Sequence, residues 1–187
     1  MSRQMEPDRR CGCGARVAAG LDRRWLLRSA GAGLLVTAAA PLARAEGGKY
    51  EAMILACIDP RTQGPVGAYA AKRGLTGQYS QFAIAGAAVG VVAPAFADWH
   101  KTFWDNLAAS IQLHRIGMVI AIDHRDCGAA AIAYGAAAIA DPAREAETHG
   151  KALAQFRQEV AQRHPTLKVE TGLMALDGSI EMFGLSG

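Results

Sequence analysis

Three side chains that can bind a soft metal ion follow two apolar runs of the chain. The first run, residues 53–56, ends at Cys57, and the second, residues 117–122, is followed by His124 and Cys127. Both runs have the composition of buried strands in a parallel sheet, and ligands bind at the carboxyl edge of such a sheet. Two cysteines and one histidine supply three zinc ligands and leave a fourth position open, which is typical of a catalytic zinc site.

The spacing of these residues resembles that of the β-class carbonic anhydrases. Residues 57–61 match C-x-D-x-R, and residues 124–127 match H-x-x-C, with Gly128 and Ala129 following. The resemblance extends over residues 50–183. It implies a Zn2+ cofactor held by the three ligands and the reversible hydration of carbon dioxide to bicarbonate by a zinc-bound hydroxide, since zinc lowers the pKa of its bound water to about 7.

The resemblance also implies roles for Asp59 and Arg61, which follow the first ligand. In the family the aspartate accepts a hydrogen bond from the zinc hydroxide and the arginine holds the aspartate, so Asp59 and Arg61 are the expected catalytic pair. In some members the aspartate leaves the arginine at lower pH and becomes the fourth zinc ligand, and Asp59 is the candidate here. The alternative for these two residues is an ordinary ion pair in a loop.

Three other functions are consistent with the same residues. The family usually ends its second strand with R-N-A-G, but Ala83 and Ile84 replace the Arg and Asn, and no Gln stands just before Cys57. A hydrolase of carbon disulfide or carbonyl sulfide would use the same ligands, and a non-catalytic zinc-binding protein would need nothing more. A thiol redox protein would use Cys57 and Cys127 without metal, but it lacks C-x-x-C and leaves His124 without a role.

The elements that must position these residues predict an α/β fold. We expect a mainly parallel central sheet of four strands with flanking helices and a short antiparallel C-terminal edge strand. Strands are predicted over residues 50–57, 82–86, 117–122 and 167–176, with residues 179–183 returning after a tight turn. Helices are predicted over residues 99–115, 128–140 and 141–163, and a loop leading into a short helix over residues 62–77. His100 and His114 are interpreted as helix residues, not as ligands.

Charge divides the chain into a basic leader and a mildly acidic body. Residues 1–45 hold eight Arg and three acidic residues, a net of +5, so residues 46–187 hold 12 Lys and Arg against 14 Asp and Glu, a net of −2. This balance argues against nucleic acid as a partner, since phosphate binding needs clustered positive charge. The expected substrate is a small molecule, carbon dioxide or bicarbonate. The resemblance is also consistent with a homo-oligomer, although few residues separate Ala45 from Tyr50, where family members carry a helical arm that wraps a partner subunit.

The basic leader resembles a twin-arginine export signal. Arg23-Arg24 precedes a mildly apolar, Ala- and Gly-rich stretch, and residues 43–45 read Ala-Arg-Ala, an A-x-A cleavage site. The stretch is too short to span a bilayer core of about 30 Å. We expect residues 1–45 to be a cleaved export signal and residues 46–187 to be a β-carbonic-anhydrase-like zinc domain, periplasmic or secreted, without stable membrane insertion. The alternative is an amphipathic anchor that stays attached.

A twin-arginine signal exports folded protein, so Cys57 and Cys127 would bind zinc in the reducing cytoplasm before they meet an oxidising compartment. Replacing both Arg23 and Arg24 with Lys is expected to leave uncleaved precursor in the cytoplasm, as measured by cell fractionation and immunoblotting. Continued export of the double variant would instead indicate the general secretory route.

Overall fold

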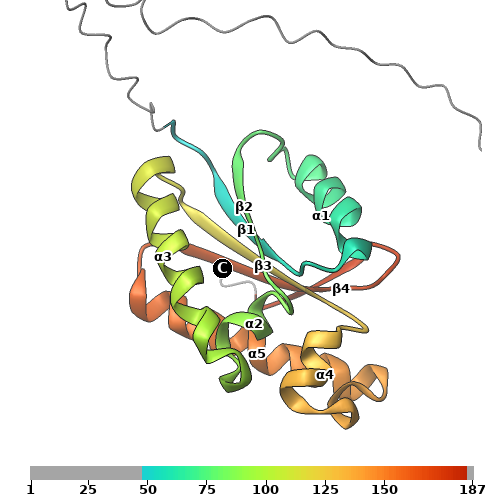
Figure 1. Ribbon diagram of the computed structural model, residues 1–187. Helices are drawn as coiled ribbons and strands as arrows, with labels where there is room; N and C mark the ends of the chain where they lie inside the picture. The colour runs from blue at the N-terminus through green and yellow to red at the C-terminus, as the bar shows by residue number, and fades with distance from the viewer. Residues whose placement is uncertain (1–47, 185–187) are drawn as a thin grey trace, which may run out of the picture. The chain divides into compact units, whose positions relative to one another are not determined.

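The computed structural model describes residues 48–184, which form a five-stranded sheet with helices on both faces (Figure 1). The strand order is β2-β1-β3-β4-β5. The strands are β1 (Ala52–Ala56), β2 (Tyr79–Ala83), β3 (Met118–His124), β4 (Lys168–Met174) and β5 (Ile180–Phe183). The first four are parallel, and β5 is antiparallel to β4 at one edge. The predicted fold class is confirmed. The predicted export signal at residues 1–45 lies outside the described residues.

β1 and β3 are neighbours in the interior of the sheet. All five residues of β1 are buried, and so are all residues of β3 except Met118. Their parallel register pairs Ala52 with Met118 and Ala56 with Ile122. Both strands therefore end at the same edge of the sheet, and the residues that follow them meet there.

Helices cover both faces of the sheet (Figure 1). α1 (Pro60–Lys72) packs on one face, where Val66 and Ala70 contact the cluster that contains Ile54 and Ile120. The other face carries α2 (Ala88–Val92), α3 (Ala97–His114), α4 (Gly128–Tyr134) and α5 (Pro142–Arg163). Short 3-10 turns follow α2 and α4, at Pro94–Phe96 and Ala136–Ile139. Within the part of the chain that the structure describes, no helix is long and apolar enough to cross a membrane.

β2 lies three residues earlier than predicted. β2 is an edge strand whose residues are partly or largely exposed, and it begins Tyr79-Ser80-Gln81. The apolar pattern that predicts a strand is therefore weak here, and the more apolar segment 82–86 led to the wrong bounds. Residues 84–86 instead turn the chain into α2. Gly86 has a φ of +82° in this turn, a conformation that glycine adopts without steric cost.

Two helices also differ from prediction. α1 begins at Pro60 without an intervening loop, because proline suits the first turn of a helix and the Asp59 side chain caps the helix by accepting from the Arg61 N–H at 2.9 Å. The helix predicted over residues 128–140 stops at Tyr134, since Gly135 has a φ of +89°. α5 begins at Pro142 and ends at Arg163, as its sequence predicts.

Phe156 on α5 is fully buried and packs against Phe103 and Trp104 of α3. Phe156→Ala is expected to lower the free energy of unfolding by about 3–5 kcal/mol, because it leaves a cavity between the helices and the sheet. Urea denaturation monitored by circular dichroism measures this loss. Ile132→Ala is the control, since that side chain is 74% exposed and its removal should cost no more than about 0.5 kcal/mol. Equal losses in the two variants would contradict this packing.

Candidate metal centre

Cys57, His124 and Cys127 come together at the carboxyl edge of the sheet. Cys57 follows β1, His124 ends β3, and Cys127 precedes α4. All three are buried, and their ligand atoms lie within 4.8 Å of one another. Bonds to zinc of about 2.0–2.3 Å would place ligand atoms about 3.3–3.8 Å apart, so small side-chain shifts suffice to close this group onto one ion. No second group of this kind is found among residues 48–184.

One ring nitrogen of His124 is hydrogen-bonded to the backbone, and the other has no hydrogen-bond partner among residues 48–184. Nδ1 lies 2.8 Å from the backbone oxygen of Arg125, and because a carbonyl oxygen only accepts, Nδ1 carries the proton. In the neutral imidazole Nε2 then keeps its lone pair, and it is buried with no hydrogen-bond partner in the described residues. Metal-binding histidines have this arrangement, with the second nitrogen donating to a carbonyl or carboxylate. The donor set therefore fits a metal ion.

Cys57 and Cys127 are both free and buried, and a hydrogen bond joins their side chains. The hydrogen bond with Cys127 lowers the pKa of Cys57 to about 4 against the opposing effect of burial, and the Gly86 N–H contributes by donating to Cys57 Sγ at 3.2 Å. The same pairing, together with burial, raises the pKa of Cys127. One thiolate thus forms readily, and a bound cation would favour deprotonation of the second thiol.

Gly86 supplies that N–H from a position that only glycine fits. Besides its φ of +82°, a Cβ added there would lie 3.0 Å from the Cβ of Ala129 and 3.1 Å from that of Val89. A larger residue would therefore displace the turn and the N–H that contacts Cys57. The sequence signal for this role is Ala85-Gly86, the part of R-N-A-G that this chain retains.

The predicted pair of Asp59 and Arg61 lies beside the ligand atoms. Arg61 Nε donates to Asp59 Oδ1 at 3.0 Å, and Nη2 donates to Oδ2 at 2.7 Å. These bonds lower the pKa of Asp59 to about 2, so the carboxylate is ionised at neutral pH. Asp59 Oδ2 is 4.0 Å from His124 Nε2, which places a hydrogen-bond acceptor next to the metal ligands rather than in a remote loop.

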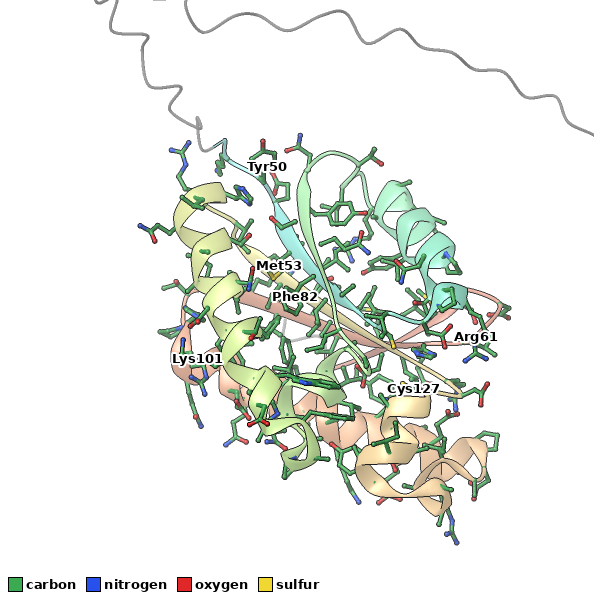
Figure 2. All side chains as sticks on the ribbon, in the orientation of Figure 1. Tyr50, Met53, Arg61, Phe82, Lys101 and Cys127 are labelled. Carbon is green, nitrogen blue, oxygen red and sulfur yellow. The ribbon has the colours of Figure 1, made fainter. Side chains whose placement is uncertain are left out.

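Two acidic residues that hold the second ligand loop were not identified from the sequence. Arg61 Nη1 donates to Asp126 Oδ2 at 2.7 Å, so one guanidinium joins the two motifs. The Asp126 N–H donates to Glu145 of α5, which also accepts from Arg125 at 3.2 Å. Figure 2 shows Arg61 and the Cys127 region at the same end of the sheet. Asp126 lies inside the H-x-x-C motif, so its position in the sequence indicated that it is close to the donor residues. Nothing in the sequence of α5 indicates that Glu145 contacts this loop.

Comparison with known proteins identifies the family. The sequence model of the family described as "Putative carbonic anhydrase" matches residues 48–179. This chain belongs to that family. Uncharacterised proteins of Rickettsia bellii and Rickettsia conorii are 30% and 29% identical to it over 129 residues, which cover 69% of this chain and 79% and 69% of theirs.

Solved β-carbonic anhydrases are similar in structure at lower identity. CafA of Aspergillus fumigatus is 17% identical with a TM-score of 0.49, covering 75% of this chain and 78% of its own. One of two tetrameric β-carbonic anhydrases of Sordaria macrospora is 18% identical with a TM-score of 0.48, covering 74% of this chain and 82% of its own.

In this carbonic anhydrase family member an apolar hollow of about 390 Å³ is lined in part by Ile58. Ile58 lies between Cys57 and Asp59 in the chain. The other residues that line it are Phe82, Ala83, Ile84, Ala85, Trp99 and Thr102. Ala83 and Ile84 stand where the family motif has Arg and Asn, so the departure from the motif makes this wall apolar.

His100 and His114 lie on α3 and outside the donor group, as their helical spacing predicts. His100 Nε2 is hydrogen-bonded to the backbone oxygen of Ala93 at 3.0 Å, and His114 Nδ1 to Ser80 Oγ at 2.7 Å. Both side chains are therefore engaged in structural contacts.

The metal-free protein is expected to bind one cobalt ion per chain and to develop the near-ultraviolet absorption of cobalt–thiolate bonds, because two of the three ligands are sulfur. Cys57→Ala, His124→Ala and Cys127→Ala should each weaken binding, and the two cysteine variants should also reduce this absorption. His100→Ala and His114→Ala serve as controls and should titrate like wild type. Unchanged cobalt binding after Cys127→Ala would rule out this ligand set.

Proposed function

We propose that residues 46–187 hold zinc through Cys57, His124 and Cys127 and catalyse the reversible hydration of carbon dioxide to bicarbonate. The observation that carries this proposal is the buried Cys2His donor set with the ionised Asp59 carboxylate 4.0 Å from His124 Nε2. Membership of the "Putative carbonic anhydrase" family supports it. The export signal predicted at residues 1–45 would place the reaction in the periplasm or outside the cell.

The chain's own residues would divide the work of the reaction. A bound zinc ion supplies the Lewis acidity that makes water a nucleophile near neutral pH. Asp59 accepts a hydrogen bond from the reacting water at Oδ2 and so orients it, as the family resemblance implies. Arg61 keeps the carboxylate ionised and in place through its Nε and Nη2 donors. Asp126 holds the far side of the same guanidinium and so restricts its movement.

The apolar hollow suits carbon dioxide, which is small and lacks a strong hydrogen-bonding group. Ile58, Phe82 and Ile84 offer it an apolar surface, and Ile58 is the residue between Cys57 and Asp59 in the chain. The same observation favours a second candidate, the hydrolysis of carbon disulfide or carbonyl sulfide, because Ala83 and Ile84 remove the polar groups of the family motif from this wall. Competition between the substrates in one assay distinguishes the two activities.

The purified protein is expected to contain one zinc per chain, measured by elemental analysis, and to hydrate carbon dioxide in a stopped-flow assay. Activity should rise from about pH 7 to about pH 9, the window set by the pKa of water bound to zinc. Cys57→Ala, which loses a ligand, provides the background rate. A wild-type protein that is loaded with zinc yet no faster than Cys57→Ala at pH 9 would leave a non-catalytic zinc-binding protein or the sulfur substrates as the function.

Asp59→Asn and Arg61→Ala are expected to lower kcat by about 10-fold or more while zinc content is preserved, because both residues orient the reaction without being required as ligands. Asp177→Asn is a matched control. Like Asp59, the exposed Asp177 accepts a hydrogen bond from the backbone N–H two residues later, here that of Ser179 at 2.9 Å. Asp177 is distant in the chain from the donor residues. Loss of zinc from Asp59→Asn would show instead that Asp59 is a resident ligand.

A further inference from the structure

A fully buried acid–base pair lies directly behind the donor set. Asp123 of β3 and His149 of α5 have no exposed surface, and Asp123 Oδ2 is 2.8 Å from His149 Nδ1. The other carboxylate oxygen, Oδ1, accepts from the Ala88 N–H at 2.8 Å. His149 Nε2 has no hydrogen-bond partner in residues 48–184, so Asp123 is the one polar contact of this imidazole within them.

Through Asp123 the pair is connected to two of the three ligands. Asp123 immediately precedes His124 in β3, so its anchoring fixes the backbone from which that ligand projects. Ala88 begins α2, and the turn before it contains Gly86, whose N–H donates to Cys57 Sγ at 3.2 Å. The bond between Asp123 and the Ala88 N–H therefore holds the turn that contacts the Cys57 sulfur.

This turn needs an external constraint. Ala87 has a φ of +48°, a conformation that is unfavourable for a non-glycine residue and persists only where the surroundings impose it. The Asp123 carboxylate is bonded to the next residue, Ala88, and supplies such a constraint. Burying an acid and an imidazole together is unfavourable compared with an apolar pair of similar volume, so packing alone does not account for them.

We propose that Asp123 and His149 are positioning residues that hold the Gly86 N–H against the Cys57 sulfur and His124 beside it, and thereby set the metal affinity of the centre. This inference rests on the proposed metal centre but not on its catalytic activity. His149 fixes the carboxylate, the carboxylate fixes the turn through Ala88, and the N–H···S bond stabilises the thiolate ligand. Groups that support ligands in this way typically change metal affinity by about 10- to 100-fold when they are removed.

The test measures zinc affinity by chelator competition and the cobalt–thiolate absorption of the full mature chain. Asp123→Ala is expected to weaken zinc binding by about 10- to 100-fold and to shift the absorption, because the Gly86 N–H no longer faces the sulfur. Asp123→Asn retains an acceptor for Ala88 and should restore both values toward wild type. A folded Asp123→Ala protein with wild-type zinc affinity and absorption would overturn the proposal.

Glu170→Ala is the matched control for the loss of a buried carboxylate. Glu170 lies on β4, is 5% exposed and accepts a hydrogen bond from Arg73 at 2.8 Å. Removal of this carboxylate should lower the free energy of unfolding but leave zinc affinity and the cobalt–thiolate absorption unchanged. If Asp123→Ala does not fold, His149→Ala decides the question on the same two readouts, and wild-type values there would overturn the proposal.

The same measurements separate this inference from the proposed function. Wild-type protein that binds zinc but does not hydrate carbon dioxide removes the proposed activity and leaves the positioning role testable by affinity. Wild-type protein that binds no zinc overturns both proposals.

Discussion

Parallel hydrogen bonding between β1 and β3 brings the two motifs into one site. Sixty-five residues lie between Cys57 and Asp123 in the chain, yet the register that pairs Ala56 with Ile122 places the ends of the two strands side by side. A slip of one residue would reverse the face to which each side chain points. Because both strands are buried on both faces, such a slip would also mismatch their side chains with the helices packed on each face. Core packing therefore protects the geometry of the donor set.

Several polar contacts then join the two loops that leave these strands. Arg61, in the first turn of α1, bonds to Asp59, which caps that helix, and to Asp126 in the loop after β3. Glu145 ties this second loop to α5. Charged groups at the edge of a sheet contribute little to stability when solvent surrounds them, and the Arg61 side chain is 45% exposed. Their value here lies in geometry, since they fix the carboxylate of Asp59 relative to the ligand atoms.

The departures from the family motif concern the surroundings of the centre rather than its ligands. The three candidate ligands and the Asp59–Arg61 pair are present and lie together, while Ala83 and Ile84 replace the polar residues of the motif with apolar ones. Zinc chemistry depends first on the ligands, whereas the choice of substrate depends on the shape and polarity of the adjoining space. The ligand chemistry and the substrate are therefore separate questions for this protein.

The sequence by itself determined the candidate donor residues, their position after the strands and the fold class. Those features are local, because apolar runs predict buried strands and the two motifs lie directly after them. It also predicted α5, since Asp-Pro at residues 141–142 is a strong helix start. It misplaced β2, whose mixed residues at the sheet edge give a weak signal.

Only the tertiary structure decided which distant residues support the centre. Glu145 and His149 lie on a polar helix whose sequence resembles any solvated helix, and their burial against β3 follows from packing, which is a property of the whole fold. The Gly86 N–H was likewise hidden, because a backbone donor has no signature in the sequence and the direction in which it points is set by the turn. Residue types and spacing indicate the candidate ligands, whereas the contacts that orient those side chains depend on how separate elements pack together.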